Sequence, residues 1–161
     1  MIMKDICSTA QAVVDLLKSR GQTLATAESC TGGLVASGLV SVPGCSSVFR
    51  EGLVTYSNES KIARLDVDPE LIKTNGAVSV EVAAAMASGV AKTSGTMIGL
   101  ATTGIAGPDG GTPEKPIGLV CIGLYAPENN TITAKHNLSG TRDEIRSQAA
   151  KLALEMVLAM Q

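Results

Sequence analysis

The chain has 161 residues, of which 45% are hydrophobic, 17% are charged and only 2% are aromatic, and its formal net charge is −2. This length and composition suit one compact domain with an aliphatic core, so we expect a single domain over residues 1–161. The scarcity of aromatic residues and the lack of a basic patch argue against a nucleic-acid partner, and no apolar run is long enough to span a membrane. An N-terminal segment without an apolar signal-peptide core predicts a cytoplasmic protein.

Helical and strand-like patterns alternate along the chain. They predict helices at 4–20, 34–40, 58–65, 69–73, 80–93 and 142–160, and strands at 23–27, 52–56, 97–102, 117–126 and 131–138. Gly21 is suited to end the first helix, Ser79 to cap the fifth, and Thr141 with Glu144 to form a capping box at the last. A turn at 127–130 makes a hairpin of the last two strands. This order predicts an α/β fold with a mixed sheet and helices on both faces.

The histidine and cysteine content restricts the chemistry that the chain can perform. His136 is the one histidine, so a Ser-His-Asp triad or a multi-histidine metal site would have to use it. The cysteines contain no CxxC pair and match no zinc pattern, which favours free thiols: Cys7, Cys30, Cys45 and Cys121. If catalysis is nucleophilic, we therefore expect a base other than histidine.

Three polar or glycine-rich segments follow predicted strands, where ligand sites of such sheets lie. In the first, at 28–33, Ser29 stands between a strand and a helix, and the N–H groups of the helix N-terminus would stabilise an alkoxide or an oxyanion there. The alternative is that Ser29 or Thr31 only caps the helix. Cys30 is a possible thiol nucleophile, although a cysteine at such a position more often packs in the core.

The second segment, at 56–61, places Lys61 in the first turn of a short helix. The helix dipole disfavours a cation there, so the pKa of Lys61 should fall, and burial would lower it further. A neutral lysine can accept the proton of a serine hydroxyl. The alternative is an ordinary surface lysine.

The third segment, at 102–111, is a glycine-rich loop that could present backbone N–H groups to phosphate or carboxamide oxygens, or else form a flexible turn. It lacks the order of residues of a P-loop. Arg142 and Arg146 lie four residues apart at the start of the last helix, where they could bind a phosphate or pair with Asp143.

Taken together, these segments resemble the family of CinA carboxy-terminal domains, the nicotinamide-nucleotide amidohydrolases (NMN deamidases). The resemblance runs from about Val13 to the C-terminus. It rests on residues 27–33 (AESCTGG), 55–58 (TYSN) with Lys61, 76–79 (GAVS), 103–111 (TGIAGPDGG), 115–118 (KPIG), and Arg142 with Arg146.

The resemblance implies a three-layer α/β/α sandwich that hydrolyses the carboxamide of nicotinamide mononucleotide to nicotinate mononucleotide and ammonia, without metal or cofactor. It makes Ser29 the nucleophile and Lys61 the general base, with Tyr56 and Thr103 in the active-site hydrogen-bonding set. The substrate-binding residues that it implies are Glu28, Thr31, Gly32, Gly33, Asn58, Gly104, Gly107, Arg142 and Arg146, with one of the two arginines on the substrate phosphate.

The chain departs from the family before its last helix, where Leu138 and Thr141 replace the usual phenylalanine and aspartate. This leaves open a catalytically inactive paralogue that acts as a nucleotide-binding module. A magnesium-dependent phosphotransferase would need more carboxylates than these loops carry. The chain resembles stand-alone members that lack a further N-terminal domain. Its mean hydropathy of +0.25 leads us to expect a homo-oligomer.

Overall fold

The computed structural model describes residues 2–127 and 130–160 and shows a mixed five-stranded sheet in the order β2-β1-β3-β4-β5. β1 pairs in parallel with β2 and β3, whereas β4 pairs antiparallel with β3 and β5. The strands are β1 (Leu24–Glu28), β2 (Phe49–Val54), β3 (Ile98–Gly104), β4 (Leu119–Ala126) and β5 (Asn130–Asn137). The predicted α/β fold with a mixed sheet is confirmed.

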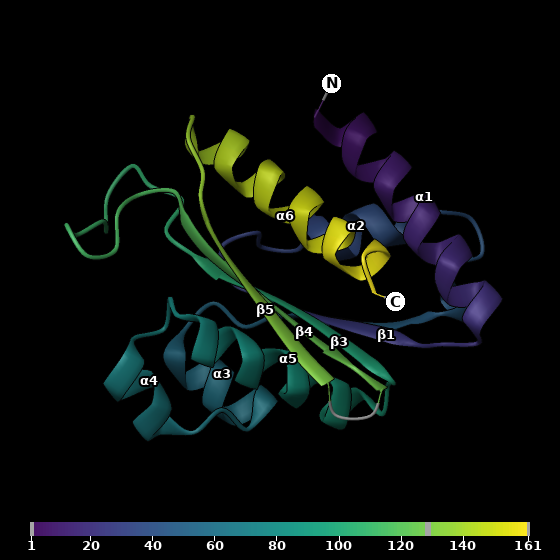
Figure 1. Ribbon diagram of the computed structural model, residues 1–161, viewed down its shortest axis with the longest axis horizontal. Coiled ribbons are helices and arrows are strands. Elements are labelled where there is room, and N and C mark those ends of the chain that lie inside the picture. Colours follow the sequence, from purple (N-terminus) through teal and green to yellow (C-terminus); the bar gives the residue numbers. More distant parts are fainter. Residues whose placement is uncertain (1, 128–129, 161) are drawn as a thin grey trace.

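Helices cover both faces of the sheet, which confirms the three-layer arrangement (Figure 1). One face carries α1 (Ile2–Arg20), α2 (Leu34–Val40) and α6 (Arg142–Leu158), and the other carries α3 (Asn58–Leu65), α4 (Pro69–Asn75) and α5 (Val80–Ser94). A 3-10 turn, η1 (Cys45–Ser47), precedes β2 and was not predicted. No helix among the described residues is both long and apolar enough to cross a membrane.

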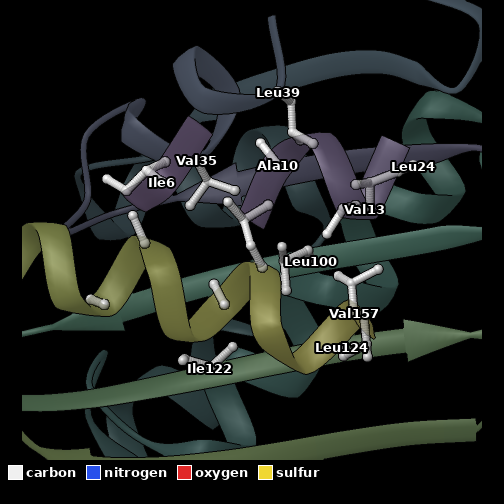
Figure 2. Close-up of a cluster of buried hydrophobic side chains, with 14 of the residues drawn as sticks. Ile6, Ala10, Val13, Leu24, Val35, Leu39, Leu100, Ile122, Leu124 and Val157 are labelled. Atoms are coloured by element: carbon white, nitrogen blue, oxygen red, sulfur yellow. The ribbon is translucent and has the colours of Figure 1, made fainter. Parts of the chain in front are cut away.

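Each face of the sheet has its own aliphatic core. Leu24 and Leu100 point into the core beneath α1, α2 and α6 (Figure 2), whereas Ala25, Ala27 and Ala101 point into the core beneath α3, α4 and α5. The second core uses small residues because α5 lies very close to the sheet. A Cβ on Gly99, for instance, would come within 1.9 Å of the Ala87 carbonyl oxygen.

The predicted boundaries hold closely for the helices and less well for the strands. α2 and α3 span the predicted residues, Ser79 caps α5, and Thr141 and Glu144 form the predicted capping box. β3 continues through Thr103 and Gly104, predicted as loop, because both pair with β4. β2 begins three residues earlier and β4 two residues later than predicted. The predicted hairpin turn includes residues 128 and 129, which lie outside the described residues.

The connections on either side of β1 run over opposite faces of the sheet. β1 leads through α2 to β2, whereas β2 returns through α3, α4 and α5 to β3 on the other side of β1. The C-terminal end of β1 is therefore a topological switch point, where ligands of open α/β sheets usually bind. The residues directly after Glu28 occupy this position.

Candidate active site

Ser29 and Lys61 meet at the C-terminal end of β1. The Nζ atom of Lys61 donates hydrogen bonds to Oγ of Ser29, at 3.2 Å, and to the carbonyl oxygen of Thr55, at 2.9 Å. Lys61 is only 1% exposed and Ser29 8%. Of the alternatives left open by the sequence, a surface location for Lys61 is thereby excluded. Because the two residues are 32 positions apart, only the fold brings them into contact.

The alternation of side chains along β1 explains why Ser29 faces a lysine. Ala25 and Ala27 point toward α3 and α5, so Ser29, two residues further on, continues on this side. Lys61 lies on α3, which covers the same face, and Ser57 caps this helix by accepting a hydrogen bond from the Ser60 amide. Glu28 directly precedes Ser29, so its side chain points to the opposite face of the sheet, toward α2.

Burial is the main cause of the lowered pKa of Lys61. Desolvation is the largest effect on this group and lowers the pKa of Lys61. The structure thus supports burial as a cause of the predicted lowering, and the contribution of the helix dipole stays a prediction. Within the described residues, no carboxylate lies within 4.0 Å of this ammonium to hold its charge.

Cys30 and His136 do not compete with Lys61 and Ser29 for these roles. Burial raises the pKa of the Cys30 thiol to about 12, so it stays protonated and packs in the core, as a cysteine at such a position usually does. His136 lies on β5, paired with Val120, and β3 and β4 separate it from β1. Adjacent strands lie about 4.8 Å apart, so the imidazole is too far from Ser29 to act as its base.

Glu28 has a structural role, which corrects the expected contact with substrate. Its buried carboxylate accepts hydrogen bonds from the Thr31 hydroxyl at 2.6 Å and from the amides of Gly33, Val35 and Ala36 at 2.8 to 3.1 Å. It therefore neutralises the N-terminus of α2 from within the protein. The expectation that these helix amides stabilise an oxyanion is wrong, because Glu28 already occupies them.

We expect Glu28→Gln to destabilise the protein by about 2–4 kcal/mol, because a buried amide NH₂ would then face backbone N–H donors and the charge-assisted bonds would be lost. The free energy of unfolding in urea measures this change. The matched control is Glu81→Gln, which alters an exposed carboxylate in the first turn of α5 and should change stability by less than about 0.5 kcal/mol. Equal stability of both variants would contradict the role given to Glu28.

Arg146 binds the main chain of the two residues that follow Ser29. Its Nε donates to the Cys30 carbonyl at 3.1 Å and its Nη2 to the Thr31 carbonyl at 3.0 Å. Its Nη1 lies 3.4 Å from the exposed Asp143 carboxylate, the pairing that the sequence left open. Gly32 has a φ of +59°, and a Cβ there would come within 3.2 Å of Nη2. Arg146 thus holds the backbone after Ser29, and a role for it on the substrate phosphate stays a prediction.

Arg142 and Tyr56 form a second, exposed cluster nearby. The Arg142 guanidinium donates to the Tyr56 hydroxyl at 3.2 Å and to the Gly107 carbonyl oxygen. Tyr56 is 63% exposed, and Arg142 is exposed as well. Arg142 is therefore the more exposed arginine of the predicted pair.

The remaining predicted site residues are distributed around the same edge of the sheet. Thr103 is buried and donates from its hydroxyl to the Ala77 carbonyl at 2.8 Å, and no described contact joins it to Ser29 or Lys61. Asn58 is exposed at the start of α3. Gly104 belongs to β3, where a Cβ would come within 2.8 Å of the Leu119 carbonyl oxygen.

Two threonines in this region were missed from the sequence. Thr55 accepts the second hydrogen bond of Lys61 through its main-chain carbonyl, a role that no sequence pattern indicates. Thr102 lies 2.7 Å from the Thr31 hydroxyl and so joins β3 to the network around Glu28. Alternation along β3 could have separated Thr102, toward α2, from Thr103, toward α5. No group of three or more potential metal ligands occurs in residues 2–127 and 130–160.

The chain is similar to proteins named CinA-like or competence-damage inducible. It is 56% identical over 150 residues to a CinA-like protein of Kosmotoga olearia, and 57% identical over 143 residues to a competence-damage inducible protein of Clostridium kluyveri. These alignments cover 93% and 88% of the chain but only 36% and 34% of the relatives. The chain thus spans about a third of the length of these curated relatives.

Solved structures of comparable size show the same fold. The competence/damage inducible protein CihA of Agrobacterium tumefaciens superposes with a TM-score of 0.93 at 40% identity, covering 96% of this chain and 94% of that one. A CinA superfamily protein of Escherichia coli superposes with a TM-score of 0.91 at 31% identity, covering 96% and 90%. The model of the CinA C-terminal domain matches residues 7–161. The chain therefore belongs to the CinA C-terminal domain family.

Proposed function

We propose that this chain hydrolyses the carboxamide of nicotinamide mononucleotide to nicotinate mononucleotide and ammonia. The observation that carries the proposal is the buried contact between Ser29 and Lys61. Nucleophilic attack on an amide needs a hydroxyl with a neighbouring base, and a desolvated lysine can be neutral enough to serve. The resemblance to NMN deamidases supplies the identity of the substrate.

The reaction proceeds in two acyl-transfer steps. Neutral Lys61 accepts the proton of Ser29 while Oγ attacks the carboxamide carbon, and the C–N bond then breaks as the lysine proton passes to the departing nitrogen, which leaves as ammonia. In the second step water attacks the ester and gives a proton to Lys61. The bond to Oγ breaks, and the proton returns to Ser29. All atoms balance without an oxidant or reductant.

Main-chain amides after Ser29 support the oxyanion in this proposal. In the described part of the chain, the amides of Ser29 and Gly32 donate to carbonyls, whereas those of Cys30 and Thr31 have no backbone acceptor. A trans peptide directs its C=O and N–H in opposite directions, so Arg146, bound to the Cys30 carbonyl, turns the Thr31 amide away from itself. Thr31 is 0% exposed, however, whereas Cys30 is 6% exposed, so of these two amides we assign that of Cys30 to the substrate oxygen.

Arg142 is the residue that we assign to the substrate phosphate. Its guanidinium is exposed and donates to the Tyr56 hydroxyl and the Gly107 carbonyl, and no carboxylate of the described residues lies within 4.0 Å of it. A guanidinium without an acidic partner keeps its charge available to an incoming anion.

The cytoplasmic location and the homo-oligomeric assembly expected from the composition stay predictions.

Ammonia release from a panel of pyridine compounds tests the proposal. We expect release from nicotinamide mononucleotide without added metal, with much lower kcat/KM for nicotinamide and nicotinamide riboside, because these lack the phosphate that Arg142 would bind. A coupled glutamate dehydrogenase assay measures the ammonia. Thermal stabilisation by the nucleotide without any release of ammonia would instead support the inactive, nucleotide-binding paralogue that Leu138 and Thr141 leave open.

A further inference from the structure

The glycine-rich segment between β3 and β4 is tethered to both helical layers. At its base, the Ile105 amide donates to the Leu119 carbonyl at 2.9 Å and the Gly118 amide to the Ile105 carbonyl at 2.7 Å. Arg142, from the α6 layer, donates to the Gly107 carbonyl. Residues 108–114 are exposed, and the segment extends beyond the sheet (Figure 1). A loop of this kind needs a further anchor if it is to keep a defined position.

Lys115 provides an anchor on the other layer. Its Nζ donates to the carbonyl oxygens of Asn75, the last residue of α4, at 2.5 Å, and of Val78, in the connection between α4 and α5, at 2.8 Å. Gly76 makes room for this ammonium, because a Cβ there would come within 2.6 Å of Nζ, and the φ of +77° also suits glycine. The ammonium is partly buried and is held by carbonyl dipoles.

The same connection carries the hydrogen bond of Thr103. The Thr103 hydroxyl donates to Ala77, whose carbonyl lies between those bound by Lys115, and Ser79 donates to Gly76 at 2.9 Å. Four consecutive carbonyls, from residue 75 to residue 78, therefore accept hydrogen bonds from side chains. Displacement of Lys115 would break the hydrogen bonds to the carbonyls of Asn75 and Val78. Thr103 would then be bound to a segment that has lost two of its four side-chain hydrogen bonds.

We propose that Lys115 is a positioning residue, which pins the glycine-rich loop and the α4–α5 connection together. It thereby holds the loop backbone and Thr103 in a fixed position, and Thr103 directly follows Thr102, whose carbonyl accepts the hydrogen bond of the Ser29 amide. The inference rests on the proposed function for its kinetic consequence, and on the geometry alone for its effect on the loop. Lys115 need not touch the substrate.

Lys115→Ala is expected to lower kcat/KM for nicotinamide mononucleotide by about 10²-fold, as displacements of about 1 Å outside the reacting centre can do. Propylammonium replaces the deleted Cγ, Cδ, Cε and Nζ atoms, so added propylammonium should restore most of the lost rate, whereas uncharged propan-1-ol should not. The matched control is Lys73→Ala, at an exposed position on α4, which should retain the kcat/KM of the parent. An unchanged rate in Lys115→Ala, or equal recovery with propan-1-ol, would overturn the proposal.

Hydrogen exchange separates this inference from the proposed function, because it needs no turnover. In the unliganded protein, the amides of Ile105 and Gly118 should exchange about tenfold faster in Lys115→Met than in the parent, while amides of α1 stay unchanged. If the parent releases no ammonia but the loop amides respond, only the proposed function fails. If exchange does not change, or if neither variant folds, the positioning role is wrong.

Discussion

Ser29→Ala is expected to lower ammonia release from nicotinamide mononucleotide by about 10⁴-fold or more, because removal of the nucleophile leaves only binding and oxyanion stabilisation. Ser29 is 8% exposed and, among the described side chains, its Oγ is hydrogen-bonded only to Lys61, so the deletion of one oxygen should leave the fold intact. Steady-state ammonia release at saturating substrate measures the effect.

Ser37→Ala is the matched control for this variant. Ser37 lies exposed on α2, close in sequence to Ser29 but outside the contacts of the site, and its alanine variant should keep the parent rate. Thermal unfolding of both variants checks that each is folded. Full activity of a folded Ser29→Ala protein would remove Ser29 from the mechanism and with it the proposed acyl-enzyme.

Lys61→Met is expected to lower kcat by about 10²- to 10⁴-fold, the usual contribution of a general base. Lys61→Arg should fail similarly, because a guanidinium does not deprotonate and is too large for a buried ammonium site. Methionine keeps the apolar stem of the lysine and removes the cost of burying a charge, so Lys61→Met should be at least as stable as the parent. A loss of activity without a loss of stability identifies a chemical role. Lys92→Met, at an exposed position on α5, is the control.

The pH dependence of kcat provides an independent test of the same residue. Burial places the pKa of Lys61 below 10.5, its ordinary value, and the neutral form is the active base. Activity should therefore rise with pH through this lowered pKa, reach a plateau above it, and be lost as the pH falls. The rising limb should disappear in Lys61→Met. A parent profile that stays flat from pH 6 to pH 10 would contradict a lysine base, and so would a limb that persists in the variant.

The sign of the stability effect follows from the same shift. The folded protein binds the proton of Lys61 less tightly than the unfolded chain does, so this group destabilises the fold fully below its folded pKa. The destabilisation decreases as the pH rises from the folded pKa toward the unfolded value. Lys61→Met should remove this component of the pH dependence, which unfolding in urea at several pH values measures.

Much of the fold could be predicted from the sequence because it depends on near neighbours. The limits of α2 and α3, the cap at Ser79 and the capping box at Thr141 follow from propensities and from hydrogen bonds within a few residues. Strand ends were less predictable, since β3 is extended by pairing with β4, some twenty residues away in the chain. Segment order and composition were enough to indicate helices on both faces of a mixed sheet.

At the candidate site, the sequence by itself determined that a serine follows the first strand, that a lysine stands in the first turn of a short helix, and that one histidine is present. Only the tertiary structure decided that Ser29 and Lys61 form a hydrogen bond and that burial lowers the pKa of the lysine. It also decided that Glu28 binds the amides at the start of α2 and that Arg146 binds the main chain after Ser29. The physical reason is that hydrogen-bond partners and desolvation depend on which distant segments pack together. Arg146 and the Thr31 carbonyl that it binds, for example, are 115 residues apart.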